Sequence, residues 1–259
     1  MGTFTYEQSV EGASGTGGGD PETISITPNA VGNLIVVHAM ERSGLSSADS
    51  ITISDNASTS HTWTRVLSFT DTNATTRKTC TSWWTTANTT SAFTITVDDG
   101  TSNNKAASAE EISYDSAITW TLLGSSSDGT AAGTIDDSTH SSGSTASIAA
   151  GDQLLLGACF IKNDSTGDNV DISFTSSALT GGTSLDSTIW NGAQAFGRHI
   201  RTGYLQETGA GTKSTTATID DTTDNNGMVV SLLVFGDTPS GGGISVPVAV
   251  HHLKQMAGN

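Results

Sequence analysis

One internal repeat constrains the fold of this chain more than any other feature of its sequence. When the sequence is shifted by 122 positions, Thr94–Asp115 lies over Thr216–Asp237, and eight of the 22 positions are identical. A second match, at a shift of 119, places Gly32–Val37 over Gly151–Leu156. Two matches with nearly the same shift favour two copies of one structural unit over chance similarity.

Short runs of strand-like sequence follow one another through both copies. Phe4 to Val10 alternates between two faces, as a β-strand does, and Leu34 to Met40 is a short apolar run typical of a strand buried on both faces. Ala106 to Ile112 has a composition that a helix could also accommodate. Its partner in the repeat, Met228 to Phe235, is plainly strand-like, so we predict a strand in both places. Ser144 to Ile148 is predicted to be the second strand of the second copy.

The predicted fold class is therefore all-β, an antiparallel β-sandwich or jelly roll made of duplicated eight-stranded units. The first unit covers residues 1–116 and the second covers residues 117–237. A Gly-rich linker and an apolar C-terminal tail fill residues 238–259. Because only Asp115 to Ala117 separates the units, they could be two sandwiches or one fused sandwich.

The charge of the chain limits its partners. It has 26 Asp and Glu residues against 10 Lys and Arg residues, a formal charge of −16. Nucleic acid and anionic lipid both require a basic surface, so neither is an expected partner. No apolar run is long enough for a membrane span, and the N-terminus does not resemble a signal peptide. Cys80 and Cys159 lie in apolar strand patterns, which predicts buried free thiols.

Acidic residues at matching strand ends are the main candidates for a metal site. Calcium binds loop carboxylates and carbonyls, but no EF-hand spacing is present, and solvated acids that cap turns are the favoured interpretation. We expect no cofactor, with calcium as the alternative. The candidate ligands are Asp98, Asp99, Asp220, Asp221 and Asp224.

No motif indicates catalysis. The serines lack a Gly-x-Ser-x-Gly elbow, and the histidines are scattered except for His251-His252 in the tail. We therefore expect a protein that is not an enzyme.

Two adjacent tryptophans suggest a binding role. Trp83 and Trp84 lie on one predicted strand and point to opposite faces, so one ring is expected in the core and the other outward. An outward tryptophan on a β-sandwich can stack on a sugar ring. Both residues are therefore candidate sugar-stacking residues, although burial of both is the simpler expectation. Trp63, Trp120 and Trp190 are expected in the core.

The tail after Asp237 is the candidate partner-binding segment. It follows Gly241–Gly243 and carries aliphatic residues that would not be well solvated alone. It could pack on another chain or fold back on its own sandwich. Its candidate contact residues are Ile244, Val246, Val248, Val250, Leu253 and Met256.

These features together resemble tailed-bacteriophage virion proteins with β-sandwich domains. The resemblance rests on an opening polar-aromatic strand (Phe4 to Gln8), Gly32 to Val37, a Ser54-Asp55 turn followed by Trp63, the paired tryptophans and the Pro247 to Met256 tail. It implies a capsid decoration (cement) protein on the outer surface of the virion. Such a protein would bind the major capsid protein or further copies of itself. The alternative is a carbohydrate-binding adhesin of a head or tail fibre that recognises host glycans.

Overall fold

The computed structural model describes ten stretches of the chain: residues 2–13, 22–41, 51–71, 78–100, 105–129, 139–162, 170–174, 189–190, 198–219 and 227–237. Within them the chain forms sixteen strands and no helix, and every strand pairing is antiparallel. The predicted all-β class is confirmed.

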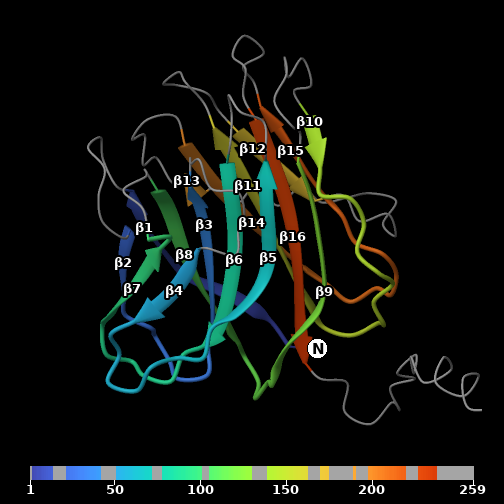
Figure 1. Ribbon diagram of the computed structural model, residues 1–259. Coiled ribbons are helices and arrows are strands. Elements are labelled where there is room, and N and C mark those ends of the chain that lie inside the picture. The colour runs from blue at the N-terminus through green and yellow to red at the C-terminus, as the bar shows by residue number, and fades with distance from the viewer. Residues whose placement is uncertain are drawn as a thin grey trace, which may run out of the picture.

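The first unit contains a five-stranded and a three-stranded sheet (Figure 1). The five-stranded sheet, here the first inner sheet, has the order β1-β8-β3-β6-β5, and the first outer sheet has the order β2-β7-β4. The strands are β1 (Phe4–Ala13), β2 (Glu22–Ile26), β3 (Leu34–Glu41), β4 (Thr52–Asp55), β5 (Thr64–Asp71), β6 (Lys78–Thr86), β7 (Phe93–Asp98) and β8 (Lys105–Tyr114).

The second unit has the same strand order with every label raised by eight. Its second inner sheet is β13-β14-β11-β16-β9, and its second outer sheet is β10-β15-β12. Thr94–Val97 and Thr216–Ile219, the two copies of the repeat, lie in the central strands of the two outer sheets. The strands are β9 (Trp120–Gly129), β10 (Thr139–Ser141), β11 (Gln153–Lys162), β12 (Val170–Phe174), β13 (Ile189–Trp190), β14 (Arg198–Glu207), β15 (Thr215–Ile219) and β16 (Gly227–Asp237).

Successive strands of the first unit mostly alternate between the inner and the outer sheet, since β1 and β3 are inner while β2 and β4 are outer. This alternation is compatible with the jelly-roll topology expected from the sequence. The finer assignment of a jelly roll stays a prediction.

The sheets are stacked in four layers, with the two inner sheets in contact. One apolar cluster lies between the inner and outer sheets of the first unit, and includes Ile35, Val37 and Ile95. Another lies between those of the second unit, and includes Leu155 and Val230. Two further clusters join the inner sheets of both units. The units are thus packed face to face through their five-stranded sheets.

Strands β3 and β11 are central in this stack and are buried on both faces. All eight residues of β3 are buried, as the mainly apolar run Leu34 to Met40, interrupted only by His38, predicts. Alternate residues face different layers: Ile35 packs in the first unit, whereas Val36 packs between the units. The aliphatic residues Val36, Val37, Leu155, Leu156, Val230 and Leu233, on β3, β11 and β16, are all fully buried. Cys80 and Cys159 are buried free thiols, as expected.

The prediction for the second strand of the second unit is wrong. Strand β10 lies at Thr139–Ser141, and Ser144 to Ile148 is irregular apart from a single bridge from Ile148 to Gly211. The amides of Thr145 and Ile148 donate to Lys213 and Gly211 rather than entering a ladder. The side chain of Ile148 is therefore buried although the residue does not lie in a strand.

Polar contacts also hold the N-terminal end of β1 to the second unit. The amide of Gly2 donates to Asp152 at 2.8 Å, and the amide of Phe4 donates to Gln206 at 3.1 Å. The hydroxyl of Tyr114, on β8, donates to the same Asp152 carboxylate at 2.5 Å. The first strand therefore joins the units as well as its own sheet.

Candidate functional site

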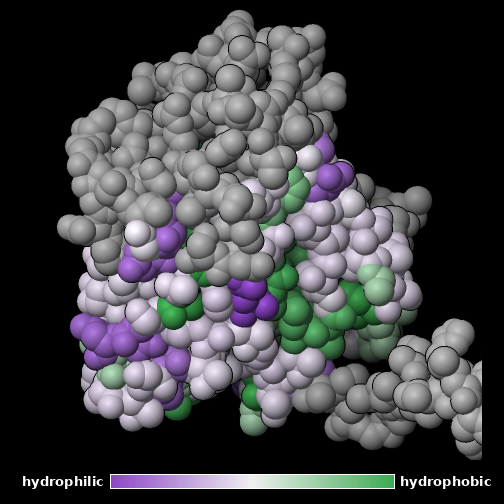
Figure 2. All heavy atoms as spheres, in the orientation of Figure 1, coloured by the Kyte–Doolittle hydropathy of each residue, from purple (hydrophilic) through white to green (hydrophobic). Residues whose placement is uncertain are grey.

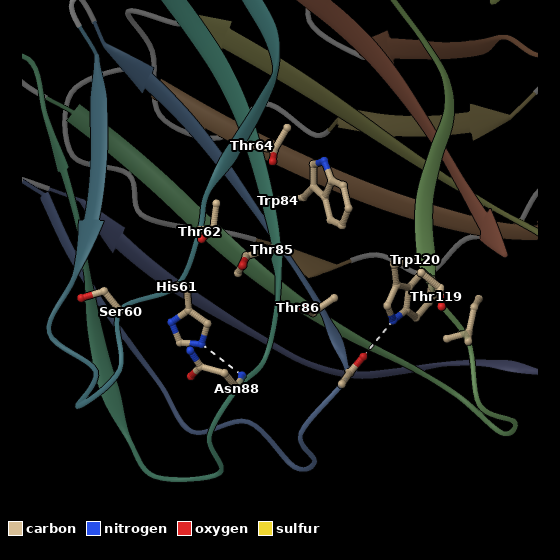
Figure 3. Close-up of a pocket in the computed structure, with 12 residues that line it drawn as sticks. Ser60, His61, Thr62, Thr64, Trp84, Thr85, Thr86, Asn88, Thr119 and Trp120 are labelled. Carbon is tan, nitrogen blue, oxygen red and sulfur yellow. Dashed lines mark hydrogen bonds between the residues drawn. The ribbon is translucent and has the colours of Figure 1, made fainter. Parts of the chain in front are cut away.

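A surface pocket of about 530 Å³ lies at the seam between the two units (Figure 3). The first unit contributes residues from three segments: Gly32, a group that leads into β5 and a group at and just after the end of β6. The second and third groups are Ser60, His61, Thr62 and Thr64, and Trp84, Thr85, Thr86 and Asn88. The second unit contributes residues 118–120, which lead into β9. The pocket is thus built from four segments that are far apart in the sequence.

One wall of the pocket is aromatic. Trp84 is only partly buried, and its ring packs edge-on against Phe235 of the second unit with ring centroids 5.5 Å apart. Trp120 is buried, and its indole Nε1 donates to the carbonyl of Gly32 at 2.9 Å. Since Gly32 belongs to the first unit, this hydrogen bond joins the rims of the pocket across the seam. The aromatic wall is therefore held in place by both units.

An apolar surface continues from this wall. Val66, Ile118 and Leu122 are partly buried and pack in the same cluster as Trp84. Figure 2 shows an apolar patch on this face, where β5, β16 and β9 come together in Figure 1. The open edge between the inner sheets thus presents apolar atoms beside the pocket.

Hydroxyl groups line another part of the pocket. Thr62, Thr64, Thr86 and Thr119 line it and are exposed. Within the described residues, no side chain or backbone group bonds to these four hydroxyls. They can therefore donate to or accept from a ligand without breaking a bond within the protein.

An aspartate and a histidine support the pocket from behind. The carboxylate of Asp55 accepts hydrogen bonds from Trp63 Nε1 at 2.8 Å and from the amides of His61 and Ala57 at 3.1 Å. Burial raises the pKa of Asp55, but these hydrogen bonds outweigh it, so the pKa lies below its ordinary value. The carboxylate is therefore ionised, and its donors come from the protein itself.

The histidine in turn positions Asn88. His61 places Nδ1 3.3 Å from the Asp55 carboxylate, and its Nε2 accepts the amide of Asn88 at 3.3 Å. The Asn88 side-chain amide donates to the carbonyl of Thr59 at 2.9 Å, and its Oδ1 has no partner within the described residues. Because Nε2 is occupied, we interpret this Asp–His pair as support for the loop that carries Asn88.

The structure places the two candidate sugar-stacking residues on opposite faces of β6, as the alternation predicts. Trp83 packs against the core of the first unit and lies under Arg65, whose guanidinium carbon is 5.5 Å from the ring centroid. Trp84 packs between the units and lines the pocket. Both rings are partly buried. Of the two, only Trp84 belongs to the pocket.

The candidate metal ligands that the structure describes have other partners. Asp98 accepts the amide of Gly100 at 2.9 Å, which is a turn-capping contact. Asp99 forms a buried ion pair with Lys105 at 2.8 Å. Within the described residues no group of three potential ligands gathers. Asp220, Asp221 and Asp224 lie outside the described residues, as do the tail positions Ile244, Val246, Val248, Val250, Leu253 and Met256.

Sequence reasoning did not associate the other pocket residues with a site. Trp120 was expected in the core, where its burial does place it, but it also closes the pocket. His61, Asn88 and the threonines carry no motif that marks a binding site. All of them except Thr119 lie in the first unit, and Thr119 joins them because the units pack together. The Ser54-Asp55 turn followed by Trp63 was the one signal nearby, and its hydrogen bonds organise the supporting loop.

A second polar group is completely buried between the inner sheets. His38 on β3 bonds through Nδ1 to the hydroxyl of Ser82 at 2.7 Å, and Ser108 donates to Glu110 Oε1 at 2.8 Å. His38 Nε2 and Glu110 Oε2 face each other at 3.7 Å, which is too far for a hydrogen bond. Neither atom has a hydrogen-bond partner within the described residues. This group, His38 with Glu110, is here called the buried His–Glu pair.

Burial controls the protonation of this pair. It raises the pKa of Glu110 to about 8, although hydrogen bonds from Ser108 and Thr202 oppose the shift. It lowers the pKa of His38 to about 3. Tyr6, on β1, also has a raised pKa, first because of burial and then because of Glu110. Near neutral pH the pair is therefore uncharged, as a dry interface between two sheets requires.

Comparisons with protein-family models, curated proteins and solved structures found no match. No helix capable of crossing a membrane occurs in the described part of the chain.

Proposed function

We propose that this protein is a saccharide-binding protein whose binding site is the pocket at the seam, and that it acts as an adhesin of a phage head or tail fibre. The observation that carries the proposal is the partly exposed Trp84 beside threonine hydroxyls that have no partner in the described protein. The role is one of binding rather than catalysis.

The chemistry of a sugar ring fits this arrangement. A pyranose has an apolar face of C–H groups, which packs on an indole ring, and a rim of hydroxyls that both donate and accept hydrogen bonds. Trp84 offers the indole, and Thr62, Thr86 and Asn88 Oδ1 offer polar partners around it. A concave, partly apolar site with a few polar groups is typical of small-ligand binding.

Replacing Trp84 by alanine tests the proposal. Loss of the stacking surface should weaken saccharide binding at least tenfold, which corresponds to about 1.4 kcal/mol. The measurement is a glycan array with the wild-type protein, followed by calorimetric titration of the strongest binder with each variant.

Trp83→Ala is the matched control, because it removes the same side chain one residue away, on the opposite face of β6. It should bind as the wild type does once folding has been checked by circular dichroism. Equal binding by wild type and Trp84→Ala, or equal losses in both variants, would contradict the proposed site.

A second candidate function is the structural one, a decoration protein fixed to capsid subunits or to further copies of itself. The observation that favours it is the way β16 ends. Asp237 pairs with Trp120 of β9, and its carboxylate accepts the amide of Thr119 at 3.2 Å. The residues that follow thus start from a point fixed to the sheet stack, which suits an anchoring tail.

Truncation after Gly241 tests this second function. If the tail anchors the protein, the truncated protein should fold normally and remain soluble but should no longer join its particle, as assayed by co-sedimentation with capsids. A full-length variant with Val246, Val248 and Val250 changed to serine should behave in the same way. Unimpaired attachment would contradict the anchoring role, and an unfolded truncated protein would favour a tail that folds back on its own unit.

A further inference from the structure

The described lining of the pocket at the seam contains no Asp, Glu, Lys or Arg. Among these described residues the one ionisable side chain is His61, which is fully buried and whose Nε2 already accepts the Asn88 amide. A charged ligand group would therefore meet neutral hydroxyls and aromatic carbon.

The carboxylates close to the pocket are already hydrogen-bonded. The Asp55 side chain is only 1% exposed and accepts three hydrogen bonds from Trp63, His61 and Ala57. Asp237, beside the rim, accepts the amide of Thr119. Neither carboxylate is directed to a cationic group of a ligand, whereas both would repel an anionic group.

The charge of the whole chain also disfavours anionic ligands. With a net charge of −16, the surface potential opposes the approach of anions, and the effect is strongest at low ionic strength. An anion that entered would also lose part of its hydration without gaining a cationic partner. Acidic saccharides are therefore disfavoured both on approach and in the bound state.

The pocket is also largely formed before a ligand arrives. The hydrogen bond from Trp120 to Gly32 joins its two rims, and the contact of Trp84 with Phe235 fixes the indole plane. A preformed site loses little entropy on binding, so neutral contacts can support measurable affinity.

We propose that the pocket selects uncharged saccharides, with a neutral pyranose ring on Trp84, and rejects sugars that carry a carboxylate, sulfate or phosphate. This inference rests on the proposed saccharide-binding function and names the class of its ligand.

The experiment compares neutral trisaccharides with their oxidised counterparts. The probes are cellotriose, galactotriose and mannotriose, each beside the same sugar with its terminal C6 hydroxymethyl group oxidised to a carboxylate. Titration calorimetry is run with the full chain at low and at high ionic strength. The best neutral sugar should bind at least tenfold more tightly than its oxidised form, and its Kd should not change with salt.

A charge introduced at the rim provides the converse test. Thr62 is exposed in the pocket, so Thr62→Lys should fold normally and should reduce the discrimination against the oxidised sugar at least tenfold at low salt. Thr62→Gln is the matched uncharged control. It removes the same hydroxyl and so shares any loss of affinity that this causes, but the ratio of neutral to oxidised binding should stay at the wild-type value.

The outcomes separate this inference from the function on which it rests. If oxidised sugars bind the wild type as tightly as neutral ones or more tightly, and Trp84→Ala abolishes that binding, the neutral-ligand inference is overturned while the saccharide function stands. If none of the sugars, neutral or oxidised, binds in a manner that depends on Trp84, the proposed function fails and the inference fails with it.

Discussion

Replacing Glu110 by glutamine should remove most of the loss of stability that the wild-type protein shows between about pH 6.5 and 8. The pKa of Glu110 is 4.5 in an ordinary environment and about 8 in the folded protein. Between these values the unfolded chain has released the proton that the folded chain keeps, so the free energy of unfolding falls as the pH rises. Each pH unit costs about 1.4 kcal/mol for one proton.

His38 has the opposite effect on the free energy of unfolding at lower pH. This effect sets the lower limit of the pH range in which Glu110 can be observed. Its pKa falls from 6.5 to about 3 on folding, so below pH 6.5 the unfolded chain binds a proton that the folded chain does not. The free energy of unfolding therefore rises from about pH 3 to 6.5. Because the effects of His38 and Glu110 cancel between pH 4.5 and 6.5, the contribution of this buried pair from pH 6.5 to 8 comes from Glu110. The expected loss there is roughly 2 kcal/mol.

Urea denaturation at several pH values across this window measures the effect. The wild type should show a falling midpoint that levels off above pH 8, and Glu110→Gln should show a nearly constant midpoint. Glu11 has a pKa raised to about 7 by burial and would contribute in the same window. Glu11→Gln is therefore the control, with a smaller expected effect because this side chain is more exposed. A wild-type slope that persists in Glu110→Gln would contradict the uncharged buried pair.

Alanine at Leu156 or at Leu155 should lower the free energy of unfolding by about 2–5 kcal/mol in either case, but the two changes should act on different layers. Both leucines are completely buried and adjacent on β11. Leu155 packs in the core of the second unit, whereas Leu156 packs between the two inner sheets. The cavity therefore forms on opposite faces of the same strand.

Tryptophan fluorescence separates the two variants. Trp84 and Trp120 belong to the same cluster as Leu156, so Leu156→Ala should shift the tryptophan emission of the folded protein and weaken saccharide binding. Leu155→Ala serves as the control of equal volume and should leave both properties close to those of the wild type. Identical spectra and binding in the two variants would contradict the face-to-face packing of the inner sheets.

Much of the fold follows from local sequence. Alternation in Phe4 to Val10 and the apolar run Leu34 to Met40 correctly located β1 and β3, and the strand-like run Met228 to Phe235 correctly located β16. The second strand of the second unit was predicted at Ser144 to Ile148, which is the wrong place, because Ile148 is buried by packing in an irregular segment. The local sequence pattern predicted a strand correctly where the backbone pairs with a neighbouring strand. Where only one side chain is buried, as at Ile148, the pattern does not show whether the backbone belongs to a sheet.

The candidate site was predictable only in part. The alternation at Trp83-Trp84 predicts that the rings face opposite sides, and this is how they lie. Which of them meets a pocket depends on the second unit, since Thr119 and Trp120 complete it. A site assembled across an interface has no spacing in the sequence, so no motif could have identified it.

The repeat itself shows where the sequence alone reaches its limit. It indicated two similar units, and the strand orders of the two units correspond throughout. However, the match at a shift of 119 places Val37 over Leu156, and these residues face different layers: Val37 packs within its own unit, whereas Leu156 packs against the other unit. The match is therefore out of register by an odd number of residues. A strand buried on both faces is apolar at most positions on both of its faces, so its sequence contains no clear alternation that could set the register. Side-chain composition thus determined that β3 and β11 are central strands, and only the packing of one inner sheet on the other decided which of their residues join the two units.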